Sequence, residues 1–157
     1  MPMSHFVVRD AILPELAATT REAVIRELVL SLHAAGKFQT SDPEEVVKAV
    51  LRRETLGSTG IGRGIAIPHS RHAAVKQLVG TVGLSKKPGA VPFDAIDGEP
   101  ADIFVLLVSP QDQPGPHLRA LESVVQRMKD DEFVKELRAC QTRDQVWDLL
   151  TRYDQGA

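Results

Sequence analysis

The sequence is poor in cysteine, in aromatic residues and in net charge. Cys140 is the only cysteine among 157 residues, so neither an intramolecular disulfide nor a cysteine-based zinc site can form, and a reducing compartment is expected. Lys and Arg total 19 and Asp and Glu total 21, which leaves a net charge of −2. This balance argues against nucleic acid, or an anionic membrane surface, as the main partner.

Long apolar runs are also missing. Val105–Val108 is far too short to span a bilayer, and residues 1–18 lack the basic segment and long apolar stretch of a secretory signal. We therefore expect a cytoplasmic protein without direct membrane insertion. The length fits one domain over residues 1–157, with about two thirds of the unfolded chain's surface buried on folding.

Strand and helix signals alternate along the chain. Asp102–Ser109 is continuously apolar rather than alternating, which predicts a central strand covered on both faces. Leu78–Leu84 is a second strand candidate, and Phe6–Val8 predicts a short strand at a sheet edge. Strands mixed with enough helices for two faces predict an α/β fold, a three-layer α/β/α sandwich.

Several positions carry helix-start signals. Thr19 and Glu22 form a capping-box pattern, and Asp42 followed by Pro43 predicts a second start. The tail from Tyr153 is expected to fray. Further helices are expected to start at His117, at Asp130 or Asp131 and at Thr142, the first with a buried stripe of Leu118, Leu121, Val125 and Met128.

The stretch LGSTGIGRGIAIPHSRH, residues 56–72, holds four of the eleven glycines. It is not a P-loop, because the Lys-Ser/Thr ending is missing, and it is not a dinucleotide fingerprint, because the glycines precede a strand. A tight turn that needs positive φ explains the pattern as well as a site does. As a site, the loop would offer backbone N–H groups to an anion, with added donors from Ser58 and Thr59.

His69 follows Pro68 and a short apolar run, so its ring is expected to be presented rigidly just past a strand. A neutral imidazole is a good nucleophile toward a phosphoryl group near neutral pH. His72 lies three residues on, but no carboxylate or cysteine stands at ligand spacing, so neither a metal nor a cofactor is expected.

Two distant residues complete a possible site. His117 alone predicts only a surface histidine in a first helical turn, yet beside His69 it would donate a hydrogen bond to a phosphoryl oxygen. Arg53, at a helix end before the glycine loop, would do the same and balance developing charge. Together with the backbone of the glycine loop, these side chains suffice chemically for a phosphocarrier. The next residue, Glu54, is expected to be a solvated helix-end charge.

The segments GSTGIGRGIAIPH and PFDAIDGEPADIFVLLVSP, followed by the HL that opens a helix, closely resemble the IIA domain of the bacterial phosphoenolpyruvate-dependent phosphotransferase system. The resemblance is to the fructose/mannitol class, and within it to the nitrogen-related branch. It implies an α/β/α sandwich with a mixed sheet. It also implies that a small histidine phosphocarrier of the HPr type phosphorylates His69, with His117 as the second active-site histidine and Arg53 as the active-site arginine.

The resemblance suggests phosphorylation at Nε2 of the histidine, although the sequence itself leaves the nitrogen open. The supporting phosphate-binding residues would be Ser58, Thr59, Gly60, Gly62 and Arg63. The relatives commonly have Asn or Glu where this chain has Arg63. An extra positive charge near the site is therefore expected, with partner choice as the property that it affects.

Three functions remain open at this point. The first is a regulatory module whose phosphorylation reports the state of the phosphotransferase system, and the stand-alone length favours it. The second is a carrier that passes the phosphoryl group to a sugar-specific IIB domain. The third is a ligand-binding domain of the same fold without phosphorylation, which the presence of His69, His117 and Arg53 makes the weakest.

Overall fold

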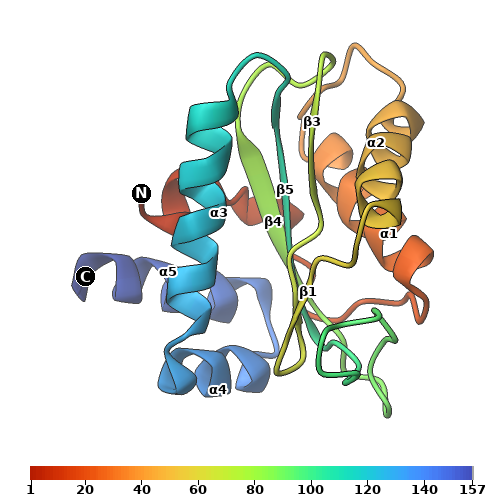
Figure 1. Ribbon diagram of the computed structural model, residues 1–157. Coiled ribbons are helices and arrows are strands. Elements are labelled where there is room, and N and C mark those ends of the chain that lie inside the picture. The colour runs from red at the N-terminus through yellow and green to blue at the C-terminus, as the bar shows by residue number, and fades with distance from the viewer. Residues whose placement is uncertain (157) are drawn as a thin grey trace.

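The computed structural model describes residues 1–156 and has a sheet between two helical layers (Figure 1). In the view of Figure 1 the sheet is seen nearly edge-on, with α1 and α2 on one side and α3, α4 and α5 on the other. This confirms the predicted α/β/α sandwich. The helices are α1 (Arg21–Ala34), α2 (Pro43–Thr55), α3 (Pro114–Met128), α4 (Asp131–Ala139) and α5 (Arg143–Gly156), and the strands are β1 (Gly60–Gly62), β2 (Ile65–Ala66), β3 (His69–His72), β4 (Val79–Leu84) and β5 (Ile103–Pro110).

Strand β5 is the centre of the sheet, as its continuous apolar sequence predicts, and all its residues are buried. Strand β4 pairs antiparallel along one edge of β5. Strands β2 and β3 both pair parallel with β5, at consecutive positions, so they share its other edge. Strand β1 pairs antiparallel with β2, which makes the sheet mixed.

The side chains of β5 alternate between two hydrophobic cores. Ile103, Val105 and Leu107 pack in the core that α3, α4 and α5 cover. The intervening residues Phe104 and Leu106, followed by Val108, pack under α1 and α2. Full burial of one such side chain is worth about 1.5–3 kcal/mol. The alternation also fixes which helical layer each later residue of β5 faces.

The helix ends largely follow the predicted signals. Asp42 caps α2 by accepting the N–H of Glu44. Thr142 and Gln145 cap α5 reciprocally, each side chain accepting the other's backbone N–H. The cap of α1 is one residue later than predicted, because the side chain of Thr20, and not of Thr19, accepts the N–H of Ala23.

Two predictions near the chain ends are wrong. The segment expected as an edge strand instead forms two 3-10 turns, Met3–His5 and Arg9–Ala11, and reaches the sheet only through isolated parallel bridges to β4. Residues 153–156 do not fray, because α5 continues to Gly156 and the Tyr153 ring packs edge-on against Phe133 with the ring centroids 5.0 Å apart, and residue 157 lies outside the described residues.

Helix α3 starts at Pro114, earlier than predicted, and its buried face is rotated from the expected stripe. Leu118 is 56% exposed, whereas His117 is buried on the face toward the sheet. The rotation turns the histidine inward, where an apolar residue would be expected. None of the helices within residues 1–156 is long and apolar enough to cross a membrane.

Candidate functional site

The two predicted histidines lie next to each other on the α3 side of the sheet. His69 pairs with Leu107 in a parallel register, and directly paired residues of parallel strands point to the same face. Leu107 packs in the core under α3, so His69 faces the same helix, which carries His117. The two ring centroids are 5.5 Å apart, and the ring planes are inclined by 54°.

His69 is the first residue of β3, rather than a residue past a strand end as the sequence predicted. Strand β2 ends at Ala66 and Pro68 interrupts the pairing, since proline has no N–H to donate. The carbonyl of Pro68 still accepts the N–H of Leu107 at 3.0 Å, so β2 and β3 remain aligned on β5. The interruption leaves the histidine at the edge of the sheet, half-buried.

The ring of His69 has a defined tautomer. Its Nδ1 lies 2.7 Å from the carbonyl oxygen of Ile67, and a carbonyl oxygen can only accept a hydrogen bond. Nδ1 therefore carries the proton and Nε2 carries the lone pair. Burial lowers the pKa of His69 below its ordinary value, and the Arg53 charge lowers that pKa further, against the opposite effect of the Ile67 hydrogen bond. At neutral pH the ring is neutral, with Nε2 as its nucleophilic atom.

His117 is also neutral at pH 7. Burial, then the charges of His69 and Arg71, lower its pKa to about 4. Its Nδ1 lies 2.6 Å from the hydroxyl of Ser109 at the end of β5. Sequence reasoning missed Ser109, although its position two residues after Leu107 in a strand of period two could have placed it on the α3 face.

Two arginines act on the imidazoles through their charge, Arg53 on His69 and Arg71 on His117. Arg53, in the last turn of α2, donates Nη1 to the carbonyl of Gly57 at 2.8 Å. Arg71, two residues after His69 on β3, donates to the carbonyl of Gln111 at 3.0 Å. Neither forms an ion pair with any carboxylate of residues 1–156. Arg71 was not predicted, although residues at i and i+2 of a strand share a face.

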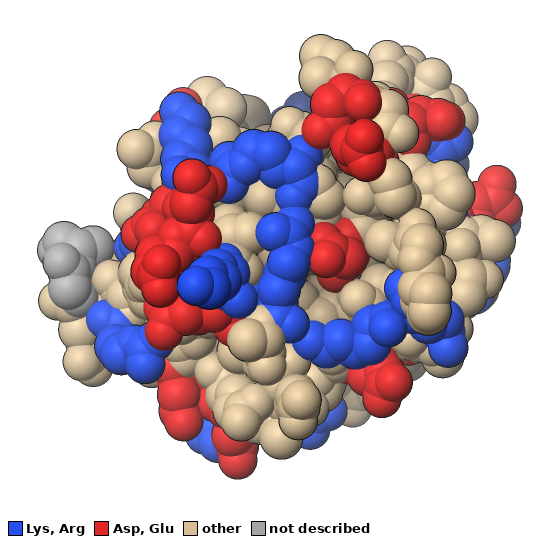
Figure 2. Space-filling view, turned by 90° about the horizontal axis from the view of Figure 1, so that it is seen from below, with Lys and Arg blue, Asp and Glu red and all other residues tan. Residues whose placement is uncertain are grey.

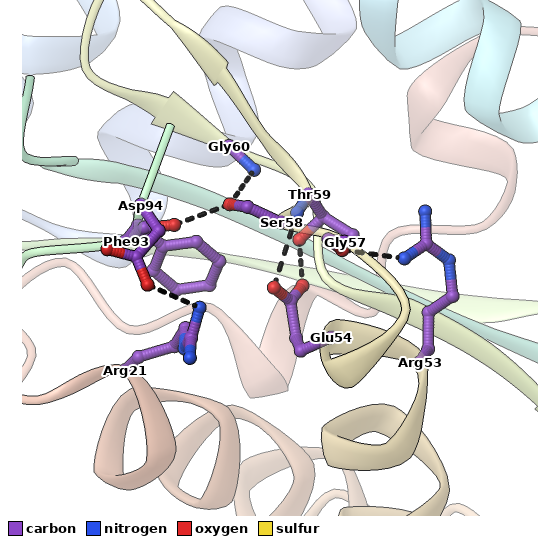
Figure 3. A network of polar contacts seen from close by, with 9 residues as sticks. All are labelled: Arg21, Arg53, Glu54, Gly57, Ser58, Thr59, Gly60, Phe93 and Asp94. Carbon is purple, nitrogen blue, oxygen red and sulfur yellow. Dashed lines mark hydrogen bonds and ion pairs between the residues drawn. The ribbon is translucent and has the colours of Figure 1, made fainter. Parts of the chain in front are cut away.

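Glu54 organises the glycine loop, as Figure 3 shows. It is 5% exposed, and its carboxylate accepts both the backbone N–H and the hydroxyl of Thr59. The expectation of a solvated helix-end charge is wrong. A second tie joins the loop to the chain further on, because the hydroxyl of Ser58 donates to the carbonyl of Phe93.

The loop donors expected to bind phosphate are engaged within the protein. The N–H and hydroxyl of Thr59 go to Glu54, and the N–H of Gly60 donates to the Ser58 oxygen at 3.0 Å. Gly60 and Gly62 lie in β1, and a Cβ on Gly60 would come within 2.9 Å of the Ala95 Cβ. These residues shape the loop that supports Arg53, and their bonded groups do not face an anion.

Arg63 lies at the other end of α3 from the histidine pair. Its Nη2 donates to the carbonyl of Met128 at 2.8 Å and to the Asp131 carboxylate at 3.0 Å. Met128 ends α3 and His117 lies in its first turn, so about 16 Å of helix separates them at 1.5 Å per residue. The expectation of an extra positive charge near His69 is wrong. Figure 2 shows this far face, where basic and acidic side chains intermingle.

Metal binding has no visible support in the part of the chain that the structure describes: across residues 1–156, no three His, Cys, Asp or Glu side chains come together in an arrangement that could hold an ion. The site consists of two neutral imidazoles and two arginines without carboxylate partners. Such a set can bind and transfer a dianionic group.

Comparison with known proteins agrees with the fold. Residues 5–153 match the family described as phosphoenolpyruvate-dependent sugar phosphotransferase system, EIIA 2, and the chain belongs to this family. The nitrogen regulatory protein of Escherichia coli K12 is 37% identical over 127 residues, which cover 80% of this chain and 77% of that protein.

A multidomain component of a phosphotransferase system is similar to the chain as well. The 2-O-alpha-mannosyl-D-glycerate-specific EIIABC component of Escherichia coli K12 is 34% identical over 152 residues, covering 96% of this chain but 22% of that protein. The crystal structure of nitrogen regulatory protein IIA-Ntr from Neisseria meningitidis superposes with a TM-score of 0.83 at 29% identity, covering 94% of this chain and 97% of that one. Both the regulatory and the sugar-specific branches are thus related to this chain.

Proposed function

We propose that His69 accepts a phosphoryl group on Nε2 from the phosphohistidine of a small HPr-type carrier protein. The observation that supports this most directly is the Nδ1–H donated to the Ile67 carbonyl, because it leaves the Nε2 lone pair free. In the transfer, that lone pair forms the new N–P bond while the N–P bond of the carrier breaks, and its electron pair stays with the carrier's imidazole. No proton needs to leave His69 for this step.

The neighbouring groups stabilise the transferred phosphoryl group. Its oxygens carry negative charge, and phosphoryl transfer depends mainly on positioning and on compensating that charge. His117 donates an N–H from the α3 side, and Arg53 supplies a guanidinium from the end of α2. The charge of Arg53 lowers the pKa of His69, so its electrostatic field also acts on a group attached to that ring.

We infer that the phosphorylated and unphosphorylated forms act as a regulatory signal of the phosphotransferase system, including nitrogen state, by binding partner proteins differently. The similarity to nitrogen regulatory proteins over most of both chains supports this assignment. The alternative is a carrier that passes the phosphoryl group to an EIIB domain of a fructose/mannitol-type transporter, which the EIIABC relative supports. Either role would place the protein in the cytoplasm.

The test is phosphorylation in vitro. The protein is incubated with phosphoenolpyruvate, the general first enzyme of the phosphotransferase system and the HPr-type carrier, and the intact mass of the protein is measured. We expect the wild type to gain one phosphate and His69→Ala to gain none, with His72→Ala as a control that still gains it. A wild type that stays unlabelled would exclude both the regulatory and the carrier function.

A second measurement separates the two roles. Phosphorylated protein is mixed with EIIB domains, and the loss of its phosphoryl group, which serves as the label, is followed over time. Rapid transfer to an EIIB domain would establish the carrier role. Retention of the label, together with partner binding that differs between the two forms, is the result expected of the regulatory protein.

A further inference from the structure

Ser109 is a polar exception in the central strand. It follows six apolar residues of β5, Ile103–Val108, and is completely buried. Burying a hydroxyl costs free energy unless it is hydrogen-bonded. The Ser109 oxygen lies 2.6 Å from Nδ1 of His117, in a bond that is itself buried.

The direction of this hydrogen bond follows from what each group needs. If Nδ1 of His117 carried the proton and donated, the buried hydroxyl hydrogen of Ser109 would need a separate acceptor. No other hydrogen bond of that side chain is found within residues 1–156. If the hydroxyl donates to the lone pair of Nδ1, both groups are satisfied, and an unbonded buried donor, which costs about 1–3 kcal/mol, is avoided.

A donating Ser109 determines the other side of the ring. A neutral imidazole has one N–H and one lone pair. When the Nδ1 lone pair accepts from Ser109, the proton is at Nε2, and the same bond fixes the rotation of the ring. The parallel register supports this placement, because Ser109 pairs with Arg71 and so lies on the face to which His69 also points.

We propose that Ser109 is a positioning residue for phosphoryl transfer, whose hydroxyl holds His117 as the Nε2–H tautomer and aims that N–H at the phosphoryl group on His69. The inference rests on the proposed function of His69. Ser109 itself touches neither the phosphoryl group nor its donor. His117 keeps its proton throughout, so no proton is transferred when the N–P bond forms at His69.

The first test observes the ring without any phosphorylation. Nitrogen-15 NMR of the histidine side chains in the unphosphorylated protein reports which nitrogen of His117 is protonated. We expect a protonated Nε2 and a hydrogen-bonded, unprotonated Nδ1 in the wild type. In Ser109→Ala the Nδ1 resonance should move to the position of a nitrogen without a hydrogen bond. A wild-type ring protonated at Nδ1, or a resonance unchanged by Ser109→Ala, would overturn the proposal.

The second test measures transfer. Ser109→Ala should accept the phosphoryl group from the HPr-type carrier about tenfold more slowly, as expected for the loss of one neutral hydrogen bond. Ser85→Ala is a matched control, because Ser85 is also buried but its hydroxyl has no partner in residues 1–156. That variant should transfer at the wild-type rate, and equal rates for Ser109→Ala and wild type would refute the inference.

A double variant separates positioning from a structural effect. If Ser109 acts through His117, then Ser109→Ala should cause no further slowing in a His117→Ala background, since coupled residues are not additive. The same tenfold loss in that background would overturn the assignment. Failure of the wild type to accept phosphate would instead refute the function of His69, and the NMR measurement would still decide the role of Ser109.

Discussion

The arginines at the two ends of the sheet are held differently. At the β1–β2 end, Arg63 pairs with Asp131 at 3.0 Å and Arg138 pairs with Asp102 at 2.9 Å. At the β3 end, Arg53 and Arg71 donate only to backbone carbonyls within the described chain.

The difference shows at which end an anion can bind without first breaking an ion pair. A carbonyl oxygen carries only a partial charge, so a guanidinium bonded to it keeps most of its attraction for a dianion. An arginine that is already paired with a carboxylate would have to break that pair first. Of the two neutral imidazoles beside Arg53 and Arg71, His69 offers the lone pair of Nε2, because its N–H is bonded to Ile67, and neither ring adds a net charge. Sequence alone shows only that both ends contain arginine.

Loss of the buried carboxylate at the β3 end should have the largest effect. In Glu54→Ala the N–H and hydroxyl of Thr59 both lose their acceptor in a buried position, so unfolding free energy should fall by about 3 kcal/mol. Urea denaturation measures this. Glu45→Ala, an exposed position of the same helix, is the control and should stay within about 0.5 kcal/mol of wild type. Equal effects of the two variants would show that Glu54 does not hold the loop.

Replacing one arginine from each end of the sheet tests the comparison directly. Arg53→Ala should slow phosphoryl transfer about tenfold to a hundredfold, which corresponds to a charged hydrogen bond of about 1.5–3 kcal/mol. Arg63→Ala should leave the rate unchanged, because Arg63 lies at the far end of α3. Single-turnover rates measured by quenched labelling decide it. A larger loss for Arg63→Ala would reverse our assignment of the two ends.

Acid should weaken the β3 end specifically. The pKa of His117 in the folded protein is about 4, below the ordinary 6.5, so between these values the unfolded chain binds more protons. The contribution of His117 to the unfolding free energy is therefore fully present above pH 6.5 and is lost as the pH falls toward 4. Unfolding free energies at pH 7 and pH 4.5 should differ by about 2 kcal/mol more in the wild type than in His117→Gln. Parallel curves would place the acid sensitivity elsewhere.

The ion pairs of the β1–β2 end should matter least. Arg63 and Asp131 are both substantially exposed, and such surface pairs contribute about 0–1 kcal/mol. Asp131→Asn should therefore change the unfolding free energy by less than about 1 kcal/mol, and less still in high salt. A large loss would mean that this end is as tightly organised as the other.

Much of the architecture was accessible from local sequence patterns. The apolar run of β5 predicts its central position, and the cap at Asp42 predicts the start of α2, because each depends on a few adjacent residues. The edge segment around Val7 misled, since short apolar pieces also form 3-10 turns that touch a sheet. The buried face of α3 was predicted one residue away, because the pattern assigned the buried position to Leu118 and not to His117.

The sequence pointed to the members of the candidate site, but not to the contacts that they make. Motif and resemblance pointed to His69, His117 and Arg53, and the structure brings the two imidazoles together. Burial of Glu54 and the contact between Ser109 and His117 depend on how distant segments pack, which no local pattern records. The prediction that Arg63 lies near His69 was wrong for the same reason. The two residues are only six positions apart in sequence, yet they lie near opposite ends of α3.

The bond from His69 to Ile67 closes a ring of only three consecutive residues. The nitrogen proposed as the phosphoryl acceptor is therefore set by a contact between residues two positions apart and involves no helix. The position of the second imidazole, by contrast, depends on how α3 packs on the sheet. Substitutions that loosen α3 should thus change how fast the protein is modified, yet leave unaltered the atom at which it is modified. We therefore expect substitutions in α3 to alter the rate of phosphoryl transfer and not the nitrogen that accepts the group.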